Sequence, residues 1–412
     1  HVRFGKAFSS LAQWAEERRE LEAALERLGT DQPQLRSEVL TELLEALWWS
    51  MDLPSLRRRA DELRVLGEQL DRADLQATAL SWLAPTVAAE GDPAGCIALA
   101  EQALARGRIP GFTPPATVHA YVSFSYHLLG RIQEAIARGK ESLRVAREAN
   151  HVSMIVQALP QLGLSLAASG CYDEAQRVFE EARRYGAEYG IRTMLARAIA
   201  MSAGYHLDVF DYAGNEALAE EARELARSLG FTPPAISAGL DLLLNFARRQ
   251  EVGRAEKLVV EVGAIVEKAT AWHGWLWGLR FAEARAEIAL ARGDWDAALQ
   301  MATQAIEQSR LRGRVKYEAL GLTTRSRALA AVGRTPDAIA DIQRAVDLAR
   351  DMGEPALFVR GARVLLALDG SDTLAAEARG HLEQIVSALP DDTLRRTFES
   401  AEPVRTVLIT AT

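Results

Sequence analysis

Cysteine is scarce in this chain of 412 residues, which contains only Cys96 and Cys171. Two cysteines in separate segments are too few for a disulfide framework, and they fit a reducing compartment. The sequence shows no signal peptide, and no apolar run reaches the roughly 18 residues that a membrane span needs. We therefore expect a cytoplasmic protein that has no membrane partner.

The usual signatures of catalysis are missing as well. The sequence contains no GxxxxGK[ST] phosphate loop, no GxGxxG after a strand, no HExxH, no CxxC and no GxSxG. We therefore expect no catalytic residues, no cofactor and no metal site. This pattern predicts that the protein is not an enzyme.

Basic residues are fewer than acidic ones. The chain has 48 Lys and Arg residues and 56 Asp and Glu residues, which gives a formal net charge of −8. This balance argues against direct nucleic-acid binding, which requires a basic face. Alternating runs of valine and isoleucine, which would indicate strands, are also missing. Alanine, leucine, glutamate and arginine dominate instead, and all four favour helices. The composition predicts an all-α fold.

One short pattern recurs along most of the chain. Gly170 is followed by a small residue five positions later, an aromatic residue nine later and alanine twelve later, at Ala175, Phe179 and Ala182. Equivalent turns fall at positions 50, 91, 130, 170, 210, 250, 293 and 333, so the period is close to 40 residues. A fixed period of this length predicts stacked helical hairpins.

A repeated hexapeptide supports the same frame. GFTPPA occurs at Gly111–Ala116 and at Gly230–Ala235, which are 119 residues or about three repeats apart. Proline lacks an amide donor and fits the first turn of a helix, so both copies mark the start of a new hairpin.

The frame divides the chain into three parts. We expect an N-terminal helix or partial repeat over 1–35, the repeat array over 36–352, and a divergent last hairpin with capping helices over 353–412. The individual helices expected outside the regular array cover 11–28, 354–367, 373–389, 391–400 and 402–408.

The recurring pattern resembles the tetratricopeptide repeat (TPR) family. Leu162 and Gly163 match the Leu-Gly pair of that family's first helix, whereas Ala286 and Ser326 replace this glycine in other copies. The family period is about 34 residues, so the helices here are expected to be longer. The resemblance implies a right-handed superhelical solenoid of about eight to nine hairpins, in which the first helices line the concave surface.

The long, alanine-rich repeats are also similar to the C-terminal sensor arrays of bacterial STAND-type signalling ATPases, including maltose-regulator-like activators. The chain begins at His1 rather than methionine, so we expect a segment of a longer protein. The resemblance implies a scaffold that binds a protein or peptide partner, or its own upstream regulatory domains, on the concave surface. The alternative is a receptor for a small-molecule inducer.

Three tryptophans fall within six residues, at Trp272, Trp275 and Trp277. Trp272 and Trp275 are three apart and share one helical face, whereas Trp277 points elsewhere. Clustered tryptophans are typical of binding hot spots, but they also fill space between a lengthened helix and its neighbours. Both interpretations remain open.

Charged residues follow on the same helix, at Arg280, Glu283 and Glu287, and Arg327 occupies a similar place in the next repeat. They form either a patch that receives a polar ligand or a salt-bridge ladder along the helix. Family geometry places inner residues thirteen, ten, six and three positions before each turn. In the preceding repeat these positions are apolar or small, at Ser237, Leu240, Leu244 and Ala247.

A third candidate region contains Phe124 and His127, in a first helix rich in aromatic residues. With Leu164 and Leu244, Phe124 could line an apolar pocket for a small molecule. The histidines of this helix lack further ligands at metal spacing, so core packing is the alternative account.

Overall fold

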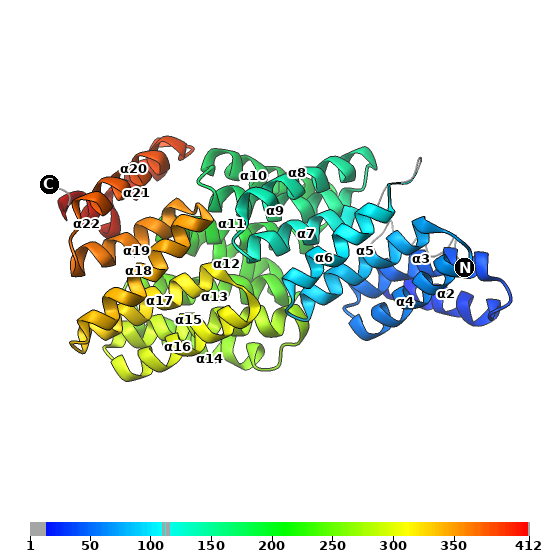
Figure 1. The fold of residues 1–412 in the computed structure, drawn as a ribbon, viewed down its shortest axis with the longest axis horizontal. Helices are drawn as coiled ribbons and strands as arrows, with labels where there is room; N and C mark the ends of the chain where they lie inside the picture. Colours follow the sequence, from blue (N-terminus) through cyan, green and yellow to red (C-terminus); the bar gives the residue numbers. More distant parts are fainter. Residues whose placement is uncertain (1–13, 109–111, 113–115, 411–412) are drawn as a thin grey trace. The chain divides into compact units, whose positions relative to one another are not determined.

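The computed structural model describes residues 14–108, 112 and 116–410, and every regular element within these ranges is an α-helix (Figure 1). The all-α class expected from composition is confirmed. The chain divides into two compact units, His1–Ser125 and Tyr126–Thr412, and the boundary falls inside one helix. The three-part division expected from the repeat frame stays a prediction.

The helices follow one another in antiparallel pairs within each unit. The first unit holds α2 (Trp14–Leu28), α3 (Pro33–Trp49), α4 (Leu53–Gln69), α5 (Ala73–Ala89), α6 (Pro93–Arg106) and the start of α7 (Ala116–Leu128). The second unit holds the end of α7 and then α8 (Ile132–Glu148), α9 (Val152–Ala168), α10 (Tyr172–Glu188), α11 (Arg192–Asp208), α12 (Tyr212–Ser228), α13 (Thr232–Arg248), α14 (Val252–Val266), α15 (Ala271–Arg292), α16 (Trp295–Arg312), α17 (Val315–Ala331), α18 (Thr335–Met352), α19 (Pro355–Leu368), α20 (Asp372–Ala388), α21 (Asp392–Ser400) and α22 (Glu402–Thr410).

The helix ends agree closely with the sequence frame. The four C-terminal helices α19 to α22 begin and end within two residues of the expected positions. The second GFTPPA copy places its prolines in the first turn of α13, as expected. The first copy, apart from its phenylalanine and final alanine, lies outside the described residues, and so do the first three residues of the helix expected from Leu11.

The turns between helices share one backbone device, a residue with positive φ. Left-handed residues occur at the expected turns Gly170, Gly293 and Gly333, and also at Phe210 and Gln250, where the frame lacks glycine. The connections between hairpins use the same device. Their described left-handed residues are Gly29, Asp71, Asn150, Gly190, Gly230, Ala271, Gly313 and Gly353. A single left-handed residue ends one helix and lets the next run back along it.

Small residues set the distance between the two helices of a hairpin. Ala175 and Ala182 of α10 are fully buried, and Phe179 between them is 3% exposed. Gly163 of α9 lies against the Phe179 ring, since a Cβ at Gly163 would lie only 2.8 Å from two ring carbons. The Leu-Gly pair noted in the sequence is therefore a close-packing requirement.

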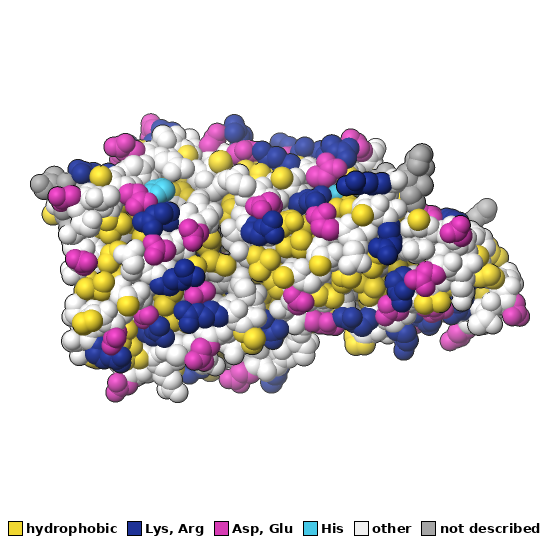
Figure 2. Space-filling model, viewed as in Figure 1, with side chains coloured by type: hydrophobic (Ala, Val, Ile, Leu, Met, Phe, Trp, Pro, Cys, Tyr) yellow, Lys and Arg dark blue, Asp and Glu magenta, His cyan; other side chains and the backbone are white. Residues whose placement is uncertain are grey.

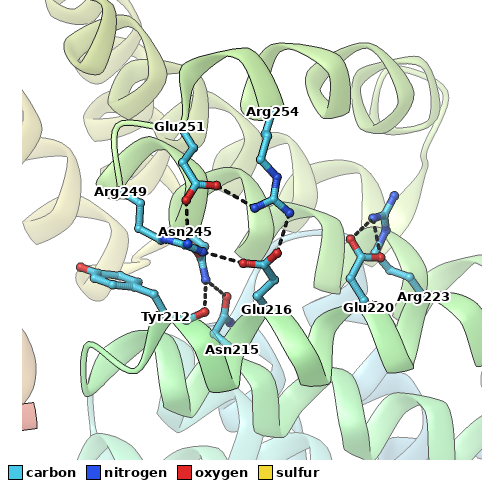
Figure 3. A network of polar contacts seen from close by, with 9 residues as sticks. All are labelled: Tyr212, Asn215, Glu216, Glu220, Arg223, Asn245, Arg249, Glu251 and Arg254. Atoms are coloured by element: carbon cyan, nitrogen blue, oxygen red, sulfur yellow. Dashed lines mark hydrogen bonds and ion pairs between the residues drawn. The ribbon is translucent and has the colours of Figure 1, made fainter. Parts of the chain in front are cut away.

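Polar contacts hold α13 against its outer neighbours (Figure 3). The Asn245 side chain donates to Asn215 Oδ1 at 2.7 Å and also to a main-chain carbonyl of α12. Figure 3 shows Arg249 and Arg254 both pointing at Glu216 of α12, and both form ion pairs with it. These contacts fix the rotation of α13 about its axis, which decides which of its side chains face inward.

The second unit curls until its early and late hairpins touch. A Cβ at Gly130 would lie 2.8 Å from Met352, and one at Gly170 would lie 2.9 Å from Pro355. The Lys316 Nζ of α17 reaches Asp208 of α11 at 2.7 Å, across 108 residues of sequence. The inner surface expected from the repeat is therefore closed on itself at these contacts. Among the described helices, none is long and apolar enough to cross a membrane.

We predict that Gly163→Ala destabilises the protein by about 1–3 kcal/mol, because the new methyl group overpacks against the Phe179 ring. The matched control is Gly380→Ala in the middle of α20, where a Cβ meets nothing within 4 Å. This control should gain about 0.5–1 kcal/mol from helix propensity. Urea denaturation followed by circular dichroism measures both, and equal effects at the two positions would contradict the packing account.

Candidate functional site

The tryptophan segment forms the start of α15, the longest helix described. Trp272 and Trp275 stack with ring centroids 5.7 Å apart, as their spacing suggested. Trp277 points elsewhere, is 5% exposed and belongs to the hydrophobic core of the second unit. It also stacks on His273, and burial next to Arg197 lowers the pKa of His273 to about 4.

Trp275 differs from its two neighbours because it stays half-buried. Its indole nitrogen is shielded from solvent and has no hydrogen-bond acceptor among the described residues. Indole N–H groups usually find a partner when they are buried. The structure thus places Trp277 in the core, while Trp275 retains an unused indole donor.

Arg280 points from α15 to α13. Its guanidinium pairs with Asp241 at 2.6 Å and donates to Ser237 Oγ at 2.9 Å. The two charged side chains are only 12% and 9% exposed. Gly204 of α11 leaves room beside this pair, because a Cβ there would lie 3.5 Å from the Asp241 carboxylate.

Glu287 also pairs with α13, through Arg248. The Nε and Nη2 atoms of Arg248 donate to one Glu287 oxygen at 3.0 and 2.8 Å. No salt-bridge ladder forms along α15, because Arg280 and Glu287 take their partners from the neighbouring helix. The ladder interpretation is therefore wrong for these residues.

The inner face of α13 is charged, not apolar as the frame predicted. Leu240 and Leu244 are 0% and 2% exposed and belong to the hydrophobic core. Asp241 and Arg248, each one position further along than the expected inner residues, make the pairs with α15. The frame is rotated by one residue on this helix, so sequence reasoning missed both.

Glu283 lies between these two pairs and is fully buried. One of its oxygens accepts from Thr324 Oγ1 of α17 at 2.8 Å, and the other has no partner among the described residues. Burial and the nearby Glu287 carboxylate raise the pKa of Glu283 from 4.5 to about 8. Burial opposes ionisation of Glu287, but the ion pair and hydrogen bonds with Arg248, together with the charges of Arg327 and Arg360, lower the pKa of that carboxyl overall. At neutral pH, Glu283 holds a proton and Glu287 is ionised.

Further charged groups come from helices distant in sequence. Lys316 bridges Asp208 and Glu354 at 2.7 and 2.6 Å. Arg314 is 7% exposed and donates to the Leu128 carbonyl at 3.4 Å. No repeat pattern indicates the contacts of Lys316 with Asp208 and of Arg314 with Leu128, since they join helices that are far apart in sequence.

We call the resulting group the charged interior of the second unit. Its members come from the inner helices α11, α13, α15, α17 and α19 and from the turns before α17 and α19. They are Asp208, Asp241, Arg248, Arg280, Glu283, Glu287, Arg314, Lys316, Arg327, Glu354 and Arg360.

The remaining sequence candidates lie in different surroundings. His127 is 6% exposed, and its Nδ1 lies 3.3 Å from Ser165 Oγ. Burial, together with the positive charges of Arg314 and Lys316, holds the pKa of His127 well below its usual range. Phe124 belongs to the first unit and is half-buried, so its role in ligand binding stays a prediction.

Solved structures with the same fold are known. A Rap protein in complex with competence and sporulation factor matches with a TM-score of 0.65 at 13% identity, covering 86% of this chain and 96% of that one. The apo form of RapI matches with a TM-score of 0.52 at 13% identity, covering 85% and 97%. Comparisons with protein-family models and with curated sequences give no match. The fold is a TPR-like helical solenoid.

We predict that Asp241→Asn costs about 3–5 kcal/mol of stability, because it leaves the buried Arg280 guanidinium without its counter-charge. The control is Glu377→Gln, which removes the exposed pair with Arg350 and should cost at most about 1 kcal/mol. Chemical denaturation of the two variants measures the difference. Similar small losses would show that the Arg280 pair is effectively solvated.

The raised pKa of Glu283 predicts that the free energy of unfolding depends on pH. Its pKa is about 8 when folded and near 4.5 when unfolded, so the folded state binds the extra proton between these values. Stability contributed by this group is therefore present below about pH 4.5 and is lost as pH rises towards 8. Glu283→Gln should flatten the pH profile of the unfolding free energy between pH 5 and 8. Parallel profiles for the variant and the original protein would refute this assignment.

Proposed function

We propose that this chain is a non-enzymatic binding array that takes a protein or peptide partner on the inner face of its second unit. In this proposal it is the sensor part of a larger cytoplasmic bacterial signalling or transcription-regulatory protein. Upstream regulatory domains of that parent protein are candidate partners too. The resemblance to STAND-type and maltose-regulator-like arrays supports this context.

The charged interior is the observation that carries the proposal. Arg280, Glu283 and Glu287 lie on one inner helix and contact partners on α13 and α17. Desolvation offsets much of the attraction in a buried ion pair, so such pairs are weak devices for stability alone. Apolar side chains of similar volume would hold the hairpins together as well. Recognition of a polar partner accounts better for so many enclosed charges.

The tryptophan pair adds a second feature that favours binding. Trp275 has a free indole donor and a half-buried ring stacked on Trp272. Tryptophan at such a position supplies rigid apolar area and one directional hydrogen bond, which is typical of hot spots.

The structural neighbours fit this interpretation. One of them is a Rap protein of the same fold that was crystallised with competence and sporulation factor. A fold of this kind can therefore receive a bound factor, which we infer for this chain as well.

A small-molecule inducer is the second candidate. The observation that favours it is enclosure, because Glu287 and Arg248 are 7% and 5% exposed and do not line an open groove. A compact ligand fits an enclosed polar interior more readily than an extended chain does.

Native mass spectrometry of the chain recovered from its own cell extract separates the two candidates. A protein- or peptide-sized added mass is expected. An added mass of a few hundred daltons would replace the first candidate with the second. A chain that carries no added mass in repeated preparations would contradict both.

Paired tryptophan variants then test the inner face. Trp275→Ala should weaken the captured complex by about 30-fold or more, the usual size of a hot-spot loss. Trp295→Ala is the matched control, since Trp295 is 37% exposed at the start of the outer helix α16. Circular dichroism checks that both variants keep their helices. Equal binding by the two variants would remove the tryptophan pair from the site.

A further inference from the structure

Three arginines converge around one carboxylate at the C-terminal side of the charged interior. Arg248 is bonded to Glu287 through two nitrogens. Arg327 of α17 and Arg360 of α19 also face Glu287, but neither lies within ion-pair distance of a carboxylate in the described chain. We call Arg248, Arg327, Arg360 and Glu287 the arginine cluster.

Arg360 also has an unused hydrogen-bond donor. Its guanidinium lies 4.9 Å above the Phe210 ring, and its Nη2 is shielded from solvent without a hydrogen-bond partner among the described residues. Burial and the neighbouring Arg248 lower the pKa of Arg360 to about 10. A ring face attracts a cation far less strongly than a carboxylate does, so this contact leaves most of the charge uncompensated.

The charge balance of the whole interior leads to the same conclusion. Six cations, Arg248, Arg280, Arg314, Lys316, Arg327 and Arg360, face five carboxyl groups, Asp208, Asp241, Glu283, Glu287 and Glu354. Six positive charges therefore face at most five negative ones, and the raised pKa of Glu283 favours the neutral form of one of the five carboxyl groups. Uncompensated charge away from water is strongly unfavourable. The excess calls for a counter-anion.

The members of the arginine cluster differ in how far they are buried. Arg327 is only partly buried, and the ion pair between Arg363 and Glu402 beside it lies near the surface. Figure 2 shows Lys and Arg side chains gathered, with carboxylates between them, over α17 to α19. Arg327 is therefore less enclosed than Arg248 and Arg360.

We propose that Arg327 and Arg360 bind an anionic group of the partner, a carboxylate or a phosphate, with Arg248 and Glu287 fixing the position of the two arginines. This inference rests on the proposed binding function and names the chemistry of what is bound. All three cations of the cluster are arginines, whose planar fork matches the two oxygens of such a group. Lysine would supply only a point charge.

The test is thermal unfolding of the full chain in inorganic phosphate and, separately, in succinate, each compared with chloride at equal ionic strength. The unmodified protein should gain about 2–4 °C in Tm at saturating anion, because only the folded state binds it. A response to phosphate alone indicates a phosphorylated partner, and a response to succinate indicates a carboxylate. No response to either anion overturns the proposal.

The double variant Arg327→Gln/Arg360→Gln should lose this response. In chloride it should melt no lower than the unmodified protein, since it lacks two like charges, whereas a purely structural role would lower its Tm. The single variant Arg327→Gln, at the more exposed position, gives the same comparison if the double variant does not fold. An unchanged anion response in these variants overturns the proposal.

Arg325→Gln is the matched control, because Arg325 lies on the same helix but points outward to Asp341 at 2.6 Å. It should keep the anion response, and loss of the response in this control would overturn the proposal.

A partner that binds the double variant as tightly as the unmodified chain would refute the anion site while leaving the binding function intact. Failure of the chain to capture any partner would count against the binding function itself.

Discussion

The fold depends on a single left-handed residue at the end of nearly every helix. Because one residue reverses the chain, successive helices must lie against each other, and the side chains between them must be small. Phe210 and Gln250 adopt this conformation without being glycine, with φ of 62° at both. The surrounding packing must therefore offset a backbone cost that glycine would avoid. Phe210 has such packing, since its ring stacks on Phe398 of α21.

The period and the small-residue stripe were sufficient to predict the hairpins. Local rules govern both, because turn conformation and close approach within a hairpin involve residues fewer than forty apart. Ala175 and Ala182 illustrate this, since a larger side chain at either position would push α9 away. The helices of the C-terminal end could be predicted for the same reason, from turn residues such as those around Ser371, which caps α20.

The candidate site could be predicted only in part. The positions of Arg280, Glu283 and Glu287 on an inner face follow from helical spacing, but their partners do not. Asp241 was missed because contacts such as those of Asn245 set the rotation of α13, and a repeat frame does not encode that rotation. Lys316 and Arg360 were missed because Lys316 pairs with Asp208 and Arg360 lies over the Phe210 ring, and both contacts join parts of the unit that are far apart in sequence.

The interior combines paired and unpaired charges in one enclosure. Arg280 and Arg248 pair with carboxylates of neighbouring helices, and Lys316 pairs with Asp208 and Glu354, which lie far apart in sequence. Only where α17 and α19 meet does positive charge exceed negative charge. A solenoid of neutral hairpins would need none of these groups, so the chemistry of the interior is separable from the architecture that encloses it.

The contact between Lys316 and Asp208 also fixes the number of hairpins. In an open repeat array each repeat touches only its neighbours, so repeats can be added or removed with little effect on the others. Here an ion pair joins the end of α11 to the start of α17, and Gly130 fits against Met352. One hairpin more or fewer between them would bring the wrong residues together. The second unit therefore has a defined length, and it behaves in this respect as a globular domain assembled from repeats.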